Sequence, residues 1–438
     1  MNRVHAENLW TLNGWQHDRE LTLAAAQAGA RVRYLLPGVC NAHSHAFQRG
    51  MAGLAERQTR IDDSFWGWRE TMYRFASLIT PDDLHAIAAQ LYVEMLEAGY
   101  TSVCEFHYLH HQPNGQPYAD PAAMSRALIA AASETGIRLC LLPVLYMSGG
   151  FDGRPLHARQ RRFAHGVEAY LKLLGTLRAE ENAGLRVGVA LHSLRAVPAA
   201  AIAEVLAVDA SSTRPIHIHI AEQIGEVQDC LAVRNARPIH WLFDHVPVGP
   251  RWQLVHATQV EASELDLIAE SGASVVLCPS TEANLGDGLF PLKPFIERRG
   301  RVAIGSDSQV SVSPVEELRW LEYGQRLLQR QRTIAADAQR PSVGERLFAA
   351  VQASTPAATG FEPDLLSADL IRLDDQQPLL AASKQSNLLD CWIFSGNAKL
   401  VQEVWVAGRS WVRDGQHQGR AAIAQRYRET LGRLSAAL

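Results

Sequence analysis

Two histidines, His43 and His45, lie two residues apart at the end of a short apolar stretch. Side chains two positions apart in an extended strand leave the same face, so both imidazoles can reach one metal ion. The pair alone is a weak indication, because the chain has 17 histidines and a His-x-His pattern can arise by chance. A metal site here requires further ligands at the ends of neighbouring strands.

Further donor residues end later strand-like stretches of the chain. His219 lies at the end of one stretch, His256 and Asp307 end two others, and Glu222 follows His219 by three positions. Each has a simpler structural explanation, since a strand-end histidine can bind a backbone carbonyl and an acid can lie at the start of a helix. Together they form a nitrogen and oxygen donor set with an open position, which is typical of a catalytic metal ion.

The stretches that carry these residues alternate with helical patterns, as parallel βα units do. Eight of them are expected to be strands, at residues 38–45, 101–106, 139–145, 187–192, 216–220, 253–256, 273–278 and 302–307. Near-continuous apolar runs favour a parallel sheet that is buried on both faces. The pattern predicts an α/β fold with a (β/α)8 TIM barrel, whose active site lies at the C-terminal ends of the strands.

Both ends of the chain depart from this rhythm and predict a smaller second domain. Residues 8–12, 390–394 and 404–407 look like antiparallel strands, with turn residues between the last two stretches. We expect a composite β-sandwich domain from residues 1–36 and 366–420, a barrel of a metal-dependent hydrolase from residues 37–365, and a C-terminal helix at residues 421–438.

The composition is that of a globular enzyme. Of 438 residues, 47% are hydrophobic and 20% are charged, and the formal net charge is −4. Binding to nucleic acid needs a concentrated basic face, so no such partner is expected. The start of the chain does not resemble a signal peptide, and no stretch approaches the ~18 apolar residues of a membrane span, so we expect a cytoplasmic protein. Six dispersed cysteines predict buried thiols rather than disulfides.

The strand-end pattern resembles the amidohydrolase superfamily, which has a His-x-His on strand one, histidines on strands five and six, and an aspartate on strand eight. The resemblance implies four metal ligands, His43, His45, His219 and Asp307. It also implies that His256 contacts the attacking water or the leaving group. The predicted fourth strand contains no lysine that could bridge two ions after carbamylation. We therefore expect one divalent metal ion per subunit, with Zn²⁺ preferred, although these ligands also accept iron and other ions.

The same resemblance implies a hydrolytic mechanism. A zinc ion brings the pKa of its water near 7 and provides hydroxide at neutral pH. Asp307 is expected to accept the proton of that water as hydroxide attacks the carbon of a C=N bond. Glu222 is expected to pass a proton to the substrate nitrogen and to the departing ammonia. Glu222, His256 and Asp307 are thus the expected catalytic residues.

Five motifs narrow the resemblance to the N-formimino-L-glutamate deiminases of histidine degradation. They lie at residues 37–53, 65–69, 105–108, 192–197 and 217–223, and the resemblance extends over nearly the whole chain. It implies hydrolysis of N-formimino-L-glutamate to N-formyl-L-glutamate and ammonia, by a homodimer. It also implies substrate contacts from Gln48, Arg69, Tyr108, His192 and Arg195. The two guanidinium groups suit a small-molecule substrate with two carboxylates.

Three alternatives remain open. The first is a related deaminase of a ring substrate such as guanine or a pterin, and the second is imidazolonepropionase, which opens a ring without releasing ammonia. The third is a barrel that has lost catalysis and serves as a binding module, although every expected ligand and acid is present. His107, His110 and His111 form a further cluster, to which the resemblance gives no ligand role.

Overall fold

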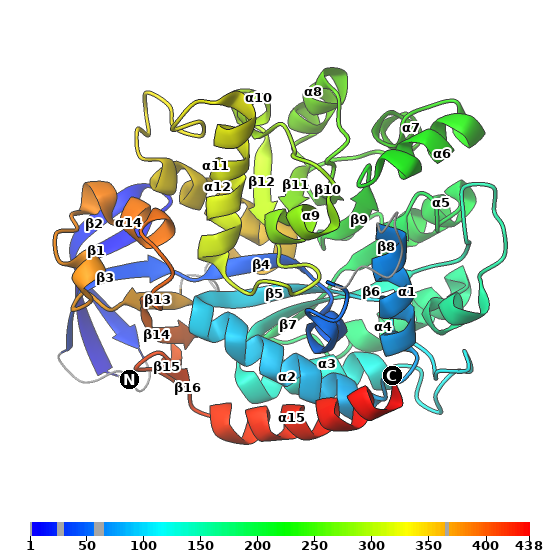
Figure 1. Ribbon diagram of the computed structural model, residues 1–438, viewed down its shortest axis with the longest axis horizontal. Helices are drawn as coiled ribbons and strands as arrows, with labels where there is room; N and C mark the ends of the chain where they lie inside the picture. Colours follow the sequence, from blue (N-terminus) through cyan, green and yellow to red (C-terminus); the bar gives the residue numbers. More distant parts are fainter. Residues whose placement is uncertain (1, 24–29, 57–64, 364–367) are drawn as a thin grey trace.

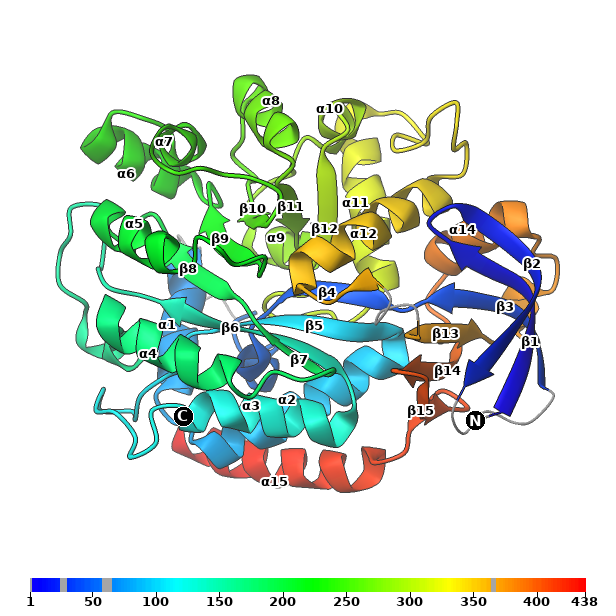
Figure 2. The same cartoon turned by 180° about the vertical axis from the view of Figure 1, so that it is seen from behind.

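The computed structural model of the chain describes residues 2–23, 30–56, 65–363 and 368–438. It consists of a barrel of parallel strands surrounded by helices and a smaller β domain at one side (Figure 1). Figure 2 shows the same arrangement from behind, with the first strands beside segments from the end of the chain. The predicted (β/α)8 barrel with a small β domain from both termini is confirmed.

The barrel strands are parallel and follow one another in chain order around the sheet. They are β4 (Val39–Ser44), β5 (Tyr100–His107), β6 (Arg138–Leu145), β8 (Val189–Ser193), β9 (Ile216–Ile220), β10 (Trp252–His256), β11 (Ser274–Leu277) and β12 (Arg301–Ile304). A short strand, β7 (Leu185–Val187), also pairs with β6. Most of their side chains are buried, as expected for strands covered by helices on one face and filled with side chains on the other.

Local sequence signals mark the ends of helices that cover the barrel. In α2 (Pro81–Ala98), the Thr80 hydroxyl accepts the Asp83 backbone N–H, Pro81 occupies the first turn, and Gly99 ends the helix with a left-handed φ of 103°. The other helices of the barrel are α1 (Phe65–Ala76), α3 (Ala123–Thr135), α4 (Val167–Arg178), α5 (Ala199–Val208), α6 (Ile224–Arg234), α7 (Pro238–His245), α8 (Ala262–Ser271), α9 (Pro279–Leu285), α10 (Leu292–Glu297), α11 (Pro314–Gln329) and α12 (Val343–Thr359). Two 3₁₀ helices, η1 (Ala46–Met51) and η2 (Ala158–Phe163), follow β4 and β6.

The first and last barrel strands, β4 and β12, meet at a seam. Their contact is an isolated bridge between Ser44 and Asp307 rather than a continuous ladder. The Asp307 N–H donates to the His43 carbonyl (3.0 Å), and the His45 N–H donates to the Asp307 carbonyl (3.1 Å). Gly305 permits this approach, because a Cβ atom there would lie 2.7 Å from the Cβ atom of His43. The seam therefore closes at the residues predicted to bind metal.

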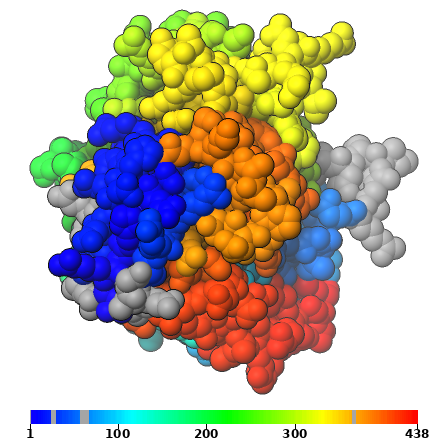
Figure 3. All heavy atoms as spheres, turned by 90° about the vertical axis from the view of Figure 1, so that its left-hand side faces the viewer, coloured from blue at the N-terminus to red at the C-terminus, as the bar shows by residue number. Residues whose placement is uncertain are grey.

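The small domain is built on one seven-stranded sheet with strands from both ends of the chain. Its order is β16-β15-β14-β13-β3-β1-β2. The bounds are β1 (Asn2–Thr11), β2 (Gly14–Leu23), β3 (Ala30–Pro37), β13 (Leu370–Leu373), β14 (Val401–Val406), β15 (Arg409–Arg413) and β16 (Gln416–His417). Val4, Leu35 and Trp405 are buried in its core. Figure 3 shows this face, where the first strands lie against the segments that follow the barrel.

The final helix, α15 (Arg420–Ala437), packs against α2 of the barrel. The Arg433 guanidinium contacts the Asp83 carboxylate of α2, and Arg426 pairs with Glu134 at 2.7 Å. The predicted boundary between barrel and small domain, at residues 365 and 366, lies outside the described residues.

One predicted strand is wrong. Residues 390–394 belong to a helix, α14 (Leu388–Phe394), which follows the 3₁₀ turns η3 (Pro378–Leu380) and η4 (Gln385–Asn387). Leu388, Leu389, Trp392 and Ile393 are its buried residues, and their spacing matches one helical face. A short apolar run alone does not distinguish a helix from a strand.

The six cysteines are free thiols, and five of them are buried, as the sequence predicts. Within the described part of the chain, every helix is too short or too polar to cross a membrane.

Candidate metal centre and substrate pocket

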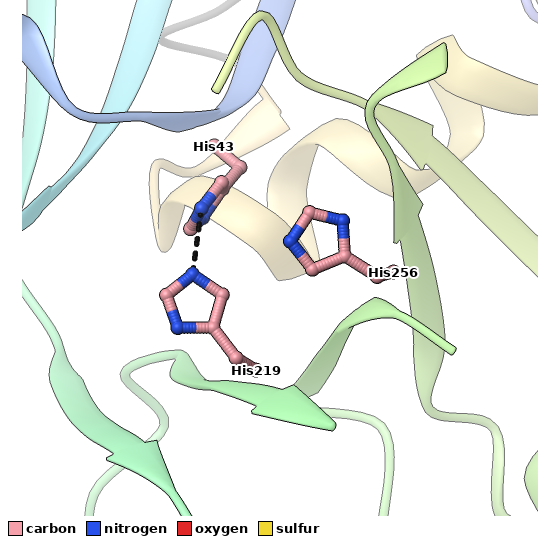
Figure 4. A group of neighbouring side chains, drawn as sticks. All are labelled: His43, His219 and His256. Atoms are coloured by element: carbon pink, nitrogen blue, oxygen red, sulfur yellow. Dashed lines mark hydrogen bonds between the residues drawn. The ribbon is translucent and has the colours of Figure 1, made fainter. Parts of the chain in front are cut away.

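Four of the predicted metal ligands converge at the C-terminal ends of three strands. His43 lies in β4 and His45 directly follows that strand, His219 lies in β9, and Asp307 follows β12. Asp307 Oδ1 lies 3.5 Å from His43 Nε2 and 3.3 Å from His45 Nε2. The Nε2 atoms of His43 and His219 are 3.0 Å apart, and Figure 4 shows these two rings pointing at each other. The geometry brings together the donors that the sequence places at separate strand ends.

The ring orientations fit metal binding. His45 donates its Nδ1 proton to the Phe106 carbonyl (2.8 Å), and His219 donates its Nδ1 proton to the His192 carbonyl (3.0 Å). Each neutral ring therefore carries its lone pair on Nε2, the atom that faces the other donors. Lone pairs this close repel unless a proton or a cation lies between them. The donor set thus suits a divalent metal ion.

Electrostatics favour the ligand forms of these residues. Burial lowers the pKa of His43 to about 3 and lowers the pKa values of His45 and His219, so the three imidazoles are neutral near pH 7. Burial alone would raise the pKa of the Asp307 carboxyl, but the hydrogen bond from His43 and the nearby imidazoles hold it well below its usual range. Neutral imidazole and carboxylate are the forms that bind metal ions.

His256 differs from the three other histidines of the centre because carboxylates surround it. Its Nδ1 atom lies 3.3 Å from Glu282 Oε1, and its Nε2 atom lies 3.9 Å from Glu222 Oε1 and 3.7 Å from Asp307 Oδ2. Burial would lower its pKa, but these acids raise the pKa of His256 to about 10. These carboxylate contacts suit His256 to proton transfer, and its ring also lies close to His43 and His219 (Figure 4).

Glu282 also contacts the candidate centre, and the sequence did not indicate it. It lies in α9, just after β11, and accepts the Cys278 N–H at 2.9 Å as well as facing His256. The available signal was its place after the seventh barrel strand, at the rim that carries the other acids.

Hydrogen bonds to the backbone around Glu222 hold this residue at the edge of the candidate metal centre. The Glu226 carboxylate accepts the N–H groups of Ala221 (3.1 Å) and Glu222 (3.0 Å), and Thr258 Oγ1 donates to the Glu222 carbonyl (2.6 Å). These bonds stabilise the left-handed φ of 50° at Ala221. Burial raises the pKa of Glu222 to about 7, aided by Asp307 and opposed by His256. A carboxyl with this pKa can accept and donate a proton near neutral pH.

A pocket opens onto this centre and is lined by every predicted substrate contact. These residues are Gln48, Arg69, Tyr108, His192 and Arg195, and they share the pocket with His45, His219, Glu222 and Asp307. Gln48 Nε2 donates to the Tyr108 hydroxyl at 2.8 Å. The rings of Tyr108 and His45 are 4.9 Å apart, and those of His192 and His219 are 5.2 Å apart. The pocket therefore adjoins the metal centre directly.

The two pocket arginines place positive charge beside the centre. The Arg69 Cζ atom lies 5.5 Å from the centroid of the Tyr73 ring. Burial and the proximity of Arg195 lower the pKa of Arg69. Within the described part of the chain, no residue accepts a hydrogen bond from the Arg195 guanidinium or pairs with it in a salt bridge. Such a pair of cations fits an anionic ligand.

Further residues, none of them an expected substrate contact, complete the wall of the pocket. They are Trp68, Met72, Tyr73, Tyr146, Phe163 and Leu285. Tyr73 lies one helical turn after Arg69, which is a detectable spacing, whereas Phe163 lies in a 3₁₀ turn without a predictive pattern.

The side chains of His110 and His111 in the histidine cluster at residues 107–111 bind backbone carbonyls. His110 Nε2 donates to the Val144 carbonyl (3.0 Å), and His111 Nε2 donates to the Ala164 carbonyl (2.6 Å). Among the described residues, none of the three-donor groups with metal-binding geometry includes His107, His110 or His111.

Comparison with known proteins identifies a matching family and a similar relative. A model of the amidohydrolase family matches residues 34–408. A formimidoylglutamate deiminase of Pseudomonas aeruginosa is 47% identical over 452 aligned positions, which cover 99% of this chain and 100% of that protein.

Two solved structures are also similar. An amidohydrolase from Brucella melitensis superposes with a TM-score of 0.93 at 41% identity, over 99% of this chain and 100% of that one. An adenosine deaminase from Xanthomonas campestris with bound zinc superposes with a TM-score of 0.82 at 21% identity, over 99% of this chain and 98% of that one. At that identity the second structure shows the shared fold alone.

Proposed function

The chain belongs to the amidohydrolase family, and from that premise we propose that it hydrolyses N-formimino-L-glutamate to N-formyl-L-glutamate and ammonia, in the cytoplasm and as a step of histidine degradation. The enzyme class, a hydrolase of C–N bonds, follows from the 47% identity to a formimidoylglutamate deiminase over 99% of the chain. The observation that carries the substrate is the pair of arginines, Arg69 and Arg195, in the pocket that opens onto the metal centre. Two guanidinium groups match the two carboxylates of formiminoglutamate.

In this proposal His43, His45, His219 and Asp307 hold one divalent ion, with Zn²⁺ as the expected species. When bound, such an ion lowers the pKa of a water and so supplies a hydroxide nucleophile near neutral pH. The carbonyls of Phe106 and His192 keep two of the imidazoles in the orientation that this binding requires.

The acids of the centre move the protons of the reaction. Asp307, a carboxylate at neutral pH, accepts a proton from the attacking water. Glu222, with a pKa of about 7, gives its proton to the formimino nitrogen, takes up the hydroxyl proton of the resulting adduct and gives it to the departing ammonia. The proton that Asp307 took from the water then returns to Glu222, so both carboxyls end as they began. His256 lies as a cation between Glu282 and Glu222. It stabilises the negative charge that develops on the atoms bonded to the formimino carbon during the attack.

The pocket residues place the formimino carbon for this attack. Arg69 and Arg195 bind the carboxylates, while Gln48, Tyr108 and His192 line the path between them and the metal centre. The Gln48–Tyr108 hydrogen bond of 2.8 Å fixes the tyrosine hydroxyl beside His45. Fixed donors of this kind convert binding energy into orientation of the reacting group.

Replacing Arg195 with alanine tests the dicarboxylate proposal. We expect kcat/KM for N-formimino-L-glutamate to fall by the equivalent of about 2–5 kcal/mol, because one substrate charge would be buried without a partner. Arg195→Lys should recover part of the loss, since lysine keeps the charge but not the two-point geometry. The measurement is a coupled ammonia assay with the product identified as formylglutamate.

The same assay separates the competing functions. A ring deaminase would act on guanine or a pterin and would not need Arg69 or Arg195, so unchanged activity in both alanine variants would contradict our proposal. Imidazolonepropionase activity would open its ring substrate without releasing ammonia. A barrel without catalysis would release no product from any of these compounds after reconstitution with a divalent ion.

We also propose a homodimer. Trp320, Leu327 and Leu328 of α11 are 39%, 75% and 64% exposed, and their spacing places them on one face of the helix. Exposed apolar side chains grouped on one face are typical of an interface. Light scattering on the purified protein is expected to give twice the chain mass, and L327E/L328E should lower it toward one chain. A monomeric wild type would contradict the proposal.

A further inference from the structure

Two tyrosines and a glutamine form a linked group in the wall of the substrate pocket. Tyr73 of α1 and Tyr146, which follows β6, both line the pocket, and Gln160 of η2 lies behind them. Gln160 Nε2 is 2.8 Å from the Tyr146 hydroxyl and 3.3 Å from the Tyr73 hydroxyl. The exposed fractions of Tyr73, Tyr146 and Gln160 are 7%, 4% and 7%, so the group is shielded from bulk water.

The orientation of the Gln160 amide is fixed by the backbone. The His157 N–H donates to Gln160 Oε1 at 2.8 Å, so the amide oxygen faces the chain and the amide nitrogen faces the tyrosines. An amide nitrogen only donates, which makes both phenol oxygens acceptors. Among the residues that the structure describes, neither hydroxyl has an acceptor for its own proton. Both protons are therefore available to a molecule in the pocket.

A second glutamine and tyrosine pair shows the contrast. Gln48 Nε2 donates to Tyr108, but its Oε1 atom is buried without a partner in the described structure, so no backbone donor fixes that amide. Tyr108 lies against the metal ligand His45. Tyr146 is separated from the candidate metal centre by one residue: its ring contacts His192 (4.3 Å), and the His192 ring contacts His219. The two pairs thus mark the near and far parts of the pocket.

The far pair lies beside the guanidinium groups. Arg69 is stacked over Tyr73, and the positive charges of Arg69 and Arg195 act on the Tyr146 hydroxyl. Burial raises the pKa of Tyr146 to about 12, so its hydroxyl keeps its proton at neutral pH. A carboxylate offers about four lone-pair positions, which two hydroxyls and guanidinium N–H groups can satisfy together.

We propose that Gln160 is a positioning residue that turns the hydroxyl protons of Tyr73 and Tyr146 into the pocket, where with Arg69, stacked over Tyr73, they bind the substrate carboxylate farther from the formimino group and leave Arg195 to the nearer one. This inference rests on the proposed function for the identity of the substrate. It assigns the γ-carboxylate of formiminoglutamate to this far subsite. Gln160 does not touch the substrate and acts through the two tyrosines.

Three sets of variants test the subsite through KM. In Gln160→Glu a carboxylate replaces the donor, so the tyrosine protons turn toward residue 160 and away from the pocket. We expect KM for N-formimino-L-glutamate to rise about 10- to 100-fold, the range for lost hydrogen bonds to a charged group, with kcat changed less than about threefold. Y73F and Y146F are each expected to raise KM about fivefold or more. Q116E adds the same charge at an exposed glutamine and should leave KM unchanged.

The role of Gln160 itself is tested by a double-mutant cycle. Gln160→Met removes the amide without adding charge and should raise KM in the wild type but not in the Y73F/Y146F background, because the residue acts through those hydroxyls. N-formimino-L-2-aminobutyrate, which lacks the γ-carboxylate, should show the same KM in wild type and Y146F. A Gln160→Met effect that persists in the double background would overturn the positioning role.

Binding of glutarate separates this inference from the proposed function. Glutarate has two carboxylates but no formimino group, and it should raise the melting temperature of the wild type more than that of Y73F/Y146F. If the wild type releases no ammonia from formiminoglutamate, the proposed function fails, and the glutarate shift alone decides the subsite. If the wild type is active but KM and the glutarate shift are the same in every variant, the subsite is wrong while the function stands.

Discussion

The Glu222→Gln variant should release ammonia about 10²–10⁴ times more slowly than the wild type, the loss typical of removing a general acid and base. Glutamine has nearly the same shape and preserves the backbone bonds to Glu226 and Thr258. It cannot take up or release a proton near pH 7, as a carboxyl with a pKa of about 7 can. We therefore expect the fall in kcat with little change in KM, measured by steady-state ammonia release.

Stability provides the control for this variant. Burial raises the pKa of Glu222 from 4.5 to about 7, so the folded state binds this proton more tightly than the unfolded state. The stabilising contribution of Glu222 to the free energy of unfolding is fully present below pH 4.5. It is lost as the pH rises through 7, because the folded protein must then hold a buried negative charge. Glu222→Gln should consequently melt at the same or a higher temperature than the wild type at pH 8. A variant that is inactive and also less stable at pH 8 would indicate misfolding instead.

A loss of similar scale is expected for His219→Ala, which removes one of the proposed metal ligands. Replacing even an outer partner of a ligand commonly costs about 10–100-fold in metal affinity or activity, so loss of the ligand itself should exceed about 100-fold. Metal analysis after dialysis should fall from about one divalent ion per chain to a small fraction, and ammonia release should fall with it.

His217 offers a matched control for the loss of a histidine. It lies two residues earlier on β9 and is fully buried, but its Nε2 atom donates to the Ala358 carbonyl. His217→Gln should retain about one ion per chain, since it removes no donor from the centre. Full metal content in His219→Ala, or equal loss in both variants, would argue against the assigned ligands.

The sequence predicted the barrel and the rim residues for the same reason. Parallel strands place their C-terminal ends on one side, so His43, His219, His256 and Asp307 had to come together once their strands were recognised. The clear helix signals around α2, such as Thr80, made the alternation of elements readable.

The features that the sequence did not predict depend on contacts between distant segments. Glu282 faces His256 only because β10 and β11 are neighbours, and Gln160 meets Tyr73 across 87 positions of the chain. No local pattern encodes such a pairing. The helix α14 was mistaken for a strand because a short, mostly apolar run fits either structure, and packing against α12 and α11 decides between them.

The seam between β4 and β12 gives the proposed metal ion a second effect. His43 and His45 stand on one side of the seam and Asp307 on the other, joined by two backbone hydrogen bonds. An ion bound to all three residues would link β4 and β12 where the ladder between them is interrupted. Part of its binding free energy would therefore stabilise the contact between these two strands. Without the ion the seam should open more often, and the amide protons of His45 and Asp307 should exchange with solvent faster than those of the barrel ladders. The affinity for the metal ion and the frequency with which the seam opens would then depend on the same equilibrium.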